Sequence, residues 1–195
     1  MKRIFDIIFS AIALLITFPL ILICIVIIKL EEPNSPVFYK QKRGGKNKQF
    51  FNIYKFRTMS TNAEITGSLT IGNDLRITKS GKWLRKFKID ELPQFFNVLI
   101  GDMSVVGPRP EVEKYINLYN EKQLEVLKIK PGITDYASII YFEENKLLGK
   151  SNNPEKIYIE EIMPHKLDLN LQYIKEKSLL IDLKIIIKTL LKVFK

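Results

Sequence analysis

Two adjacent carboxylates, Asp90 and Glu91, are the residues of this chain best suited to chemistry. Arg76, Arg85 and Lys88 precede them, and Pro93 just after them predicts the start of a helix. Phosphate groups bind where cations meet the free N–H groups of a helix N-terminus. A carboxylate at such a place can attack phosphorus, and its neighbour can hold a magnesium ion. The alternative is an ordinary helix start with Asp90 as the N-cap, which is the commoner case for an isolated Asp-Glu pair.

Other cations of the chain are candidates for binding a diphosphate. Lys55 and Arg57 flank one aromatic residue, and Arg109 lies between two prolines in the sequence Gly-Pro-Arg-Pro. The prolines restrict the backbone, so this arginine has little conformational entropy left to lose. Ammonium and guanidinium groups are the usual protein donors to phosphate oxygens. The sequence therefore predicts phosphate contacts from these cations, with solvated surface charge as the alternative.

The positive charge of the chain is concentrated in one block. The formal net charge is +10, and residues 40–88 hold thirteen Lys and Arg against only Glu64 and Asp74. This block requires an anionic partner, which is phosphate, acidic lipid or nucleic acid. A nucleic-acid binder is disfavoured because an uncharged apolar run is foreign to that class and no familiar nucleic-acid motif occurs. We expect no nucleic-acid partner.

The N-terminal element is an apolar run. Residues 7–28 contain 22 residues without a charge, which is enough for a helix that crosses a bilayer. Pro19 near the middle removes a helix hydrogen bond and bends the helix. Positive residues flank both ends, Lys2 and Arg3 before the run and Lys40 after it, and the positive-inside rule keeps both flanks cytoplasmic. On these features alone, a kinked span and a re-entrant helix are equally supported.

The rest of the chain predicts helices and one hairpin. Aromatic and β-branched residues around a Gly-Gly pair predict a β-hairpin between residues 36 and 59. The next predicted elements are a loop and three helices, at residues 61–81, then 83–88, 92–100 and 111–128. Near the C-terminus, Lys184, Lys188 and Lys192 form a lysine stripe on an otherwise apolar helix. This helix is either a core helix with one solvated edge or an interfacial helix on anionic lipid.

Several stretches together resemble the bacterial sugar transferase family, the monotopic phosphoglycosyl transferases. They include Asp90-Glu91-Leu92-Pro93-Gln94 and the Gly-Pro-Arg-Pro turn. In order along the chain, the matching stretches are residues 2–6, 41–45, 53–59, 76–82, 90–94, 96–110, 130–134 and 182–186. One stretch alone is weak, but the ordered set covers nearly the whole chain and is specific.

The resemblance implies an α+β, mainly helical fold. Residues 1–30 are expected to form a re-entrant membrane helix with a proline kink. Residues 31–195 are expected to form a small cytoplasmic catalytic domain, with a short β-hairpin and interfacial amphipathic helices, the last over residues 178–194. The family is monotopic, so the resemblance places the protein at the inner membrane with this domain on the cytoplasmic face.

The resemblance also implies a reaction. A sugar-1-phosphate moves from a UDP-sugar to a polyprenyl phosphate such as undecaprenyl phosphate, and UMP is released. Asp90 is expected to be the nucleophile that forms a phosphosugar–aspartyl intermediate, and Glu91 to bind Mg²⁺. The expected phosphate-binding residues are Lys55, Arg57, Arg76, Arg85 and Arg109. Membrane lipid and the later glycosyltransferases of the glycan pathway are the other expected partners.

The chain departs from the family's pattern at two places. Phe18 precedes Pro19 where many relatives have Ser-Pro, and an acidic stretch at residues 135–144 replaces a basic one, which leaves the sugar open. The competing hypothesis is a non-enzymatic binder of lipid surfaces. That hypothesis accounts for the basic block and the apolar ends without needing either carboxylate.

Overall fold

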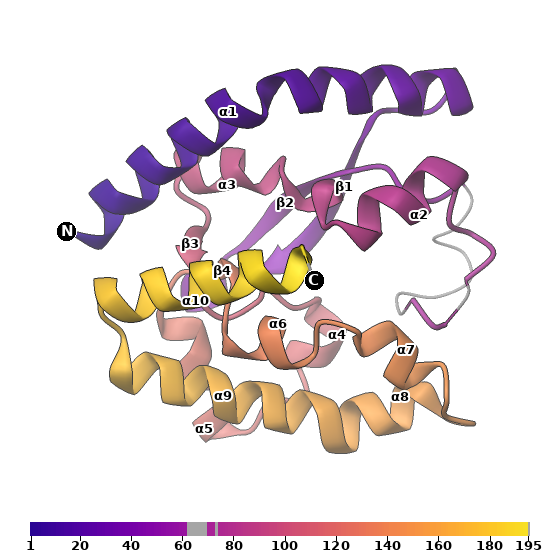
Figure 1. The fold of residues 1–195 in the computed structure, drawn as a ribbon. Coiled ribbons are helices and arrows are strands. Elements are labelled where there is room, and N and C mark those ends of the chain that lie inside the picture. Colours follow the sequence, from indigo (N-terminus) through magenta and orange to yellow (C-terminus); the bar gives the residue numbers. More distant parts are fainter. Residues whose placement is uncertain (62–69, 73, 195) are drawn as a thin grey trace.

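The computed structural model describes residues 1–61, 70–72 and 74–194 of the chain. One long helix, α1 (Lys2–Glu31), lies along one side of the molecule above the other elements (Figure 1). Among the described residues it is the one helix long and apolar enough to cross a membrane. Figure 1 shows a bend near its middle, where Pro19 has no N–H to donate to the preceding turn. The predicted long apolar helix is confirmed.

The predicted β-hairpin is also confirmed. Strand β1 (Phe38–Gly44) pairs antiparallel with β2 (Phe50–Phe56), and Gly44 lies opposite Phe50. The connection is longer than the Gly-Gly pair suggests, because it contains a 3₁₀ turn, Lys46–Lys48, in which Asn47 has a φ of 55°. The hairpin passes behind α2 and α3 in Figure 1 and carries Lys55.

A second sheet was not predicted from the sequence. Strand β3 (Ser104–Val106) pairs parallel with β4 (Gly132–Thr134). All three residues of β3 are buried. A strand of this length with both faces buried has no alternation of polar and apolar residues, so periodicity cannot reveal it. This small sheet fixes the chain immediately before the Gly-Pro-Arg-Pro turn, because β3 ends at Val106.

Helices make up most of the remaining structure, with α1 at the top of the view and α9 near the bottom (Figure 1). The helices are α2 (Lys79–Lys86), α3 (Gln94–Ile100), α4 (Glu113–Ile116), α5 (Glu121–Leu124), α6 (Tyr136–Ile140), α7 (Glu144–Leu148), α8 (Pro154–Ile157), α9 (Met163–Glu176) and α10 (Leu179–Val193). Tighter or wider turns lie at Ile89–Glu91, Glu125–Lys128 and Tyr158–Ile162. The C-terminal helix matches the predicted range of 178–194 to within one residue at each end.

The predicted single helix over residues 111–128 is wrong. The segment forms α4, α5 and a 3₁₀ turn instead. Asn120 accepts a hydrogen bond from the backbone N–H of Gln123, whose side chain accepts one in return from the backbone of Asn120. Such a capping box starts a new helix and interrupts the preceding one.

The helix predicted at residues 83–88 begins earlier, at Lys79. Its N-cap is Thr78, whose side chain accepts a hydrogen bond from the N–H of Gly81. The predicted loop over 61–81 is therefore too long at its end, and its residues 62–69 and 73 lie outside the described residues. The helix predicted at 92–100 is confirmed over Gln94–Ile100 and ends at Gly101 with a φ of 103°.

Buried apolar side chains join both halves of α1 to the rest of the protein. Phe5 and Phe9 pack on a core formed by the two sheets, α3, α9 and α10. Cys24 and Ile28 belong to a second core, together with Phe56 of the hairpin and Leu84 of α2. A third core lies under α9 and includes Tyr115, Val126, Leu148, Tyr158 and Leu167. The two carboxylates lie in the short segment between α2 and α3, which both contact α1.

Candidate active site

A break in the backbone after α2 places the two carboxylates inside the protein. Lys88 has a left-handed conformation with a φ of 55°, and the 3₁₀ turn Ile89–Glu91 follows directly. Asp90 and Glu91 are 6% and 9% exposed. Neither the 3₁₀ turn nor α3 receives a side-chain cap at its start, so Asp90 is not an ordinary N-cap. Buried carboxylates without a capping role point to a functional site.

Glu91 is held by two cations from distant parts of the chain. Arg109 donates to both carboxylate oxygens, with Nη1 3.1 Å from Oε2 and Nη2 bonded to Oε1. Lys55 Nζ lies 2.9 Å from Oε1. Burial alone raises the pKa of a carboxyl group, but the charges of Arg109 and Lys55 hold the pKa of Glu91 well below its ordinary value. Glu91 is therefore ionised throughout the physiological range.

Asp90 lies in a different environment from its neighbour. Its Oδ1 is buried and has no hydrogen-bond partner among the described residues. Burial, with the adjacent charge of Glu91, raises the pKa of Asp90 above its ordinary value, and the charges of Lys55, Lys88 and Arg85 offset part of that rise. A poorly solvated carboxylate with an unbonded oxygen is well prepared to attack an electrophile.

Arg109 is presented by the Gly-Pro-Arg-Pro turn, and backbone hydrogen bonds to β4 fix the first two residues of this turn. Gly107 N–H donates to Thr134 O at 3.0 Å, and Gly132 N–H donates to Pro108 O at 2.9 Å. The backbone N–H of Arg109 itself donates to Asp135 Oδ2 at 3.3 Å. The guanidinium is thus aimed at Glu91 by the β3–β4 sheet and by a fully buried aspartate.

A second network supports the same turn from behind. Glu111 accepts a hydrogen bond from Arg43 Nη1 at 3.2 Å and another from the hydroxyl of Tyr158. Arg43 Nη1 also lies 3.2 Å from Pro110 O. Gly44 N–H donates to Glu111 O at 2.8 Å, so the hairpin is joined to the turn as well.

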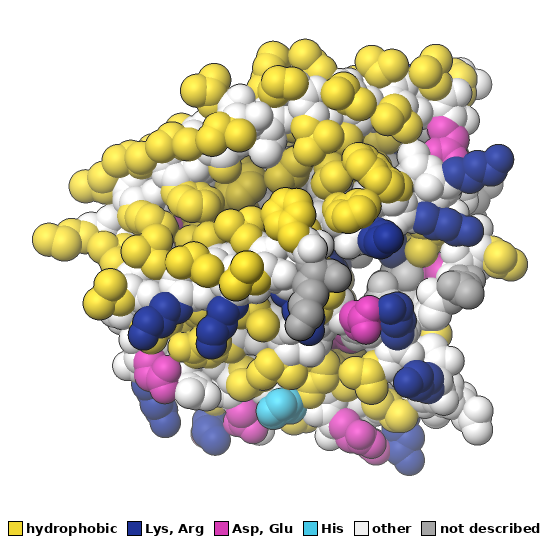
Figure 2. Space-filling view, viewed as in Figure 1, with side chains coloured by type: hydrophobic (Ala, Val, Ile, Leu, Met, Phe, Trp, Pro, Cys, Tyr) yellow, Lys and Arg dark blue, Asp and Glu magenta, His cyan; other side chains and the backbone are white. Residues whose placement is uncertain are grey.

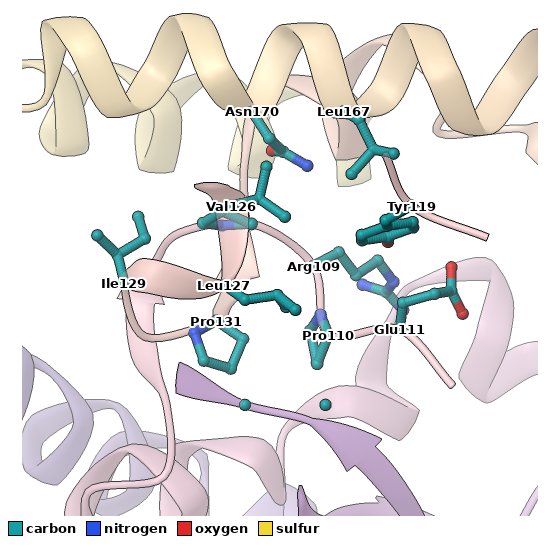
Figure 3. A pocket seen from close by; sticks show the side chains of 13 residues that line it. Arg109, Pro110, Glu111, Tyr119, Val126, Leu127, Ile129, Pro131, Leu167 and Asn170 are labelled. Carbon is teal, nitrogen blue, oxygen red and sulfur yellow. The ribbon is translucent and has the colours of Figure 1, made fainter. Parts of the chain in front are cut away.

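Behind the turn lies a cavity of about 20 Å³, shown in Figure 3 between α9, residues 126–131 and the end of β1. The side chain of Asn170 points into it (Figure 3), and its Oδ1 has no partner among the described residues. This space has room for one water molecule and is too small for a sugar nucleotide.

The structure brings three of the five predicted phosphate-binding residues to the carboxylates. Lys55 and Arg109 bond to Glu91, and the charge of Arg85 acts on both carboxylates. Arg85 donates to Thr58 Oγ1 at 2.8 Å and to Thr70 Oγ1 at 3.1 Å. Burial lowers the pKa of Arg85 from its ordinary value, although the guanidinium stays protonated.

The other two predicted residues bond elsewhere. Arg57 Nε donates to Pro36 O at 2.8 Å, and Arg76 pairs with Asp74 at 2.6 Å. Their roles as phosphate ligands stay predictions. Lys88 was named among the cations before the carboxylates but not among the expected phosphate-binding residues; its charge acts on both carboxylates, and its ammonium lies 5.0 Å from the centre of the Phe142 ring. Its place next to Asp90 was the available signal.

The residues present fit a site for a magnesium ion whose remaining ligands would come from the substrate. Within the described residues no group of three or more His, Cys, Asp or Glu side chains could hold a metal alone. Mg²⁺ is commonly held by one or two carboxylates together with substrate phosphates. Glu91 is the carboxylate expected to hold the ion, and Asp90 beside it keeps an unbonded Oδ1. The ion would stabilise negative charge on the diphosphate.

Comparison with known proteins places this site in a family. The model of the bacterial sugar transferase family matches residues 1–195. The chain is 40% identical over 193 residues to the uncharacterized sugar transferase EpsL of Bacillus subtilis, covering 99% of this chain and 87% of that protein.

Two further relatives have names that state an activity. One is the UDP-N-acetylgalactosamine-undecaprenyl-phosphate N-acetylgalactosaminephosphotransferase of Aeromonas hydrophila, 38% identical over 97% of this chain and 42% of that protein. The other is the UDP-glucose:undecaprenyl-phosphate glucose-1-phosphate transferase of Escherichia coli, 37% identical over 100% of this chain and 40% of that protein. This chain thus spans less than half of each of these two relatives. The match over its whole length shows that the chain belongs to the bacterial sugar transferase family.

Proposed function

We propose that this protein is a phosphoglycosyl transferase that moves a sugar-1-phosphate from a UDP-sugar to a polyprenyl phosphate. The observation that carries the proposal is the buried pair of carboxylates, one held by cations and the other with an unbonded oxygen. The names of the relatives from Aeromonas hydrophila and Escherichia coli support the choice of donor and acceptor. The product would enter surface polysaccharide or glycoprotein glycan synthesis through later glycosyltransferases.

The proposed reaction has two displacements at one phosphorus atom. Asp90 Oδ1 attacks the phosphate that carries the sugar, an O–P bond to Asp90 forms, and the P–O bond to UMP breaks with its electrons on UMP. An oxygen of the polyprenyl phosphate then attacks the same phosphorus, which returns Asp90 to a free carboxylate. Lys55, Arg85 and Arg109 stabilise the charge on the phosphate oxygens in both steps. Glu91 orients Lys55 and Arg109 and would be the carboxylate that holds Mg²⁺.

The lipid acceptor requires contact with a membrane, and we propose a re-entrant placement of α1. At its start, Lys2 pairs with Asp182 at 2.6 Å and Arg3 donates to Leu99 O at 2.9 Å. At its end, Glu31 accepts from the backbone N–H groups of Lys79 and Ser80 at 2.7 and 3.0 Å. Because both ends bond to the same folded unit, they belong on the same side of a bilayer.

The surface of the molecule supports this placement. Figure 2 shows hydrophobic side chains gathered over α1 at the top of the view and in a band below it, with Lys and Arg side chains beneath that band. The outer face of α1 exposes large apolar side chains such as Leu15, Ile16 and Leu30, which are at least 72% exposed. On α10, Leu180, Leu191 and Phe194 are exposed beside the lysine stripe. This pattern favours an interfacial α10 and a domain on the cytoplasmic face of the inner membrane.

The reaction is tested with purified protein in detergent, Mg²⁺, undecaprenyl phosphate and a panel of UDP-sugars, with UMP release as the readout. We expect UMP from the wild type and none from Asp90→Asn. Asp168→Asn is the matched control, because Asp168 is an exposed aspartate paired with Lys122 on the surface. UMP release by Asp90→Asn at the wild-type rate would rule out the covalent mechanism, and no release by any protein would support the lipid-surface binder.

The topology is tested with Lys2→Cys and Asn34→Cys, each in a Cys24→Ser background. A membrane-impermeant maleimide should label both cysteines in inverted vesicles and neither in intact cells. Labelling of the two positions from opposite sides would mean that α1 spans the membrane.

A further inference from the structure

The carboxylate expected to bind metal is already bonded to protein cations. Arg109 bonds to both oxygens of Glu91, and Lys55 shares Oε1 with it. The side chain of Glu91 is only 11% exposed, so these cations take the place of solvent. A metal ion bound through Oε1, or through both oxygens, would displace at least one of these bonds, and an ion bound through Oε2 alone would lie against the guanidinium of Arg109.

The two cations differ in their freedom to leave. Lys55 lies on β2, and its side chain is 19% exposed. Arg109 has a backbone fixed by Asp135 and a side chain that is 34% exposed. Its guanidinium can therefore move by rotation about side-chain bonds, while the turn that carries it stays in place. Arg109 is the cation able to exchange partners.

The charges around the site favour one order of events. Lys55, Arg85, Lys88 and Arg109 surround two carboxylates, so the cluster carries excess positive charge. A divalent cation entering alone adds to that excess, whereas a diphosphate neutralises it. A phosphate also offers the planar guanidinium two oxygens, as the carboxylate does.

We propose that Arg109 couples donor binding to metal binding by exchanging partners. In the free protein the guanidinium of Arg109 bonds to Glu91. When the donor binds, the guanidinium leaves Glu91 and bonds to the oxygens of the donor diphosphate. The released Glu91 carboxylate then accepts the metal ion. This inference rests on the proposed function, in which the donor is a UDP-sugar and Glu91 binds Mg²⁺. Because such coupling is reciprocal, bound metal must strengthen donor binding by the same factor.

The test measures metal affinity in the absence of any donor. Mn²⁺ replaces Mg²⁺ as the probe, and free Mn²⁺ is followed by electron paramagnetic resonance with the full-length chain in detergent. We expect Arg109→Gln to bind Mn²⁺ about tenfold more tightly than wild type or better, since the bidentate pair no longer competes. Glu91→Gln added to that variant should abolish the gain. These results would place the ion on Glu91.

Arg85→Gln is the matched control. It removes the same charge near the same carboxylates, but Arg85 donates to Thr58 and Thr70 and not to Glu91. We expect its Mn²⁺ affinity to change less than about threefold, because distance and solvent weaken a charge that makes no direct contact. Arg109→Lys, which keeps the charge and loses the two-pronged geometry, should give an intermediate gain and serves if Arg109→Gln does not fold.

Two results would overturn the exchange. One is an Arg109→Gln protein that is folded by thermal unfolding and binds Mn²⁺ no more tightly than wild type. The other is an equal gain from Arg85→Gln, which would assign the effect to charge in general. UMP release by the wild type is measured separately. If Arg109→Gln gains Mn²⁺ affinity but the wild type releases no UMP from any donor, the exchange is retained and the transferase is rejected.

Discussion

Asp90 and Glu91 are neighbours of the same chemical type, yet their neutral analogues should change stability in opposite directions. Asp90 is buried with an oxygen that has no partner among the described residues, whereas Glu91 bonds to Arg109 and Lys55. Asp90→Asn removes a charge that folding must desolvate, and it should stabilise the protein. Glu91→Gln leaves two cations without their partner, and it should destabilise the protein.

The magnitudes follow from these contacts. The amide that replaces Asp90 is still a buried polar group, so the gain comes only from removing the charge; because one pKa unit corresponds to about 1.4 kcal/mol, we expect a gain of about 1–2 kcal/mol from Asp90→Asn. Breaking one side of a buried ion pair costs about 3–5 kcal/mol, which is the expected loss from Glu91→Gln. For a chain of this length, each kcal/mol shifts Tm by about 2–4 °C. The two variants should therefore unfold at temperatures well separated on either side of the wild type.

The pH dependence separates the two causes further. The pKa of Asp90 is raised by burial, so the unfavourable contribution of its charge develops as the pH rises through the folded-state pKa. The gain from Asp90→Asn should be largest above the folded-state pKa of Asp90 and shrink towards about pH 4, near the ordinary pKa. The pKa of Glu91 is lowered, so its contribution is present above the ordinary value of about 4.3 and disappears only below it.

Thermal unfolding in detergent with EDTA, at pH 7.5 and at pH 4.5, measures both effects. Both variants should lose UMP release, so stability and activity must be read separately. A fall in Tm for Asp90→Asn equal to that for Glu91→Gln at pH 7.5 would refute the reasoning. It would mean that the ionised Asp90 carboxylate makes stabilising interactions in the folded protein that the amide cannot make.

Three further predictions test the parts that surround the carboxylates. Tyr158→Phe removes the hydroxyl that donates to Glu111 and loosens the turn that carries Arg109. Steady-state kinetics should show about tenfold lower kcat/KM. An unchanged value would mean that this hydrogen bond does not position Arg109. Gly132→Ala places a Cβ 2.1 Å from the backbone nitrogen of Gly107 and should lower the unfolding free energy by about 1–3 kcal/mol in thermal melts, unless the two strands can move apart freely. Asp6→Asn replaces a buried carboxylate that accepts hydrogen bonds from the hydroxyl of Ser104 and the backbone N–H of Val105. Weaker bonds should speed hydrogen exchange at the start of α1 and not at its end.

Elements with strong local patterns were predictable from the sequence. The apolar run around Pro19 fixed the helical state of α1, and the aromatic-rich segments beside a Gly-Gly pair fixed the hairpin. The sheet of β3 and β4 was not predictable, because two strands of three residues, buried everywhere except at the half-buried Ile133, leave no period to detect. Its existence depends on the pairing of segments that are far apart in the chain.

The site was predictable as a set of residue types and not as a set of contacts. The carboxylates and three cations could be named because their chemistry is visible in the residues themselves. Asp135 and Tyr158 could not, because each acts on a residue 26 or 47 positions earlier in the chain. Asp135 lay in a stretch noticed only for its departure from the family's pattern, and nothing local indicated that it would accept the N–H of Arg109.

The attachment of α1 at both ends has a consequence for the lipids this protein can tolerate. A helix that spans a bilayer must match its apolar length to the thickness of the hydrocarbon, and a mismatch tilts the helix or deforms the lipid. In the proposed placement the depth of α1 is set by bonds from Lys2, Arg3 and Glu31 to the folded domain. Activity should then be nearly the same in vesicles of short-chain and long-chain lipids, and the same enzyme would serve membranes of different thickness.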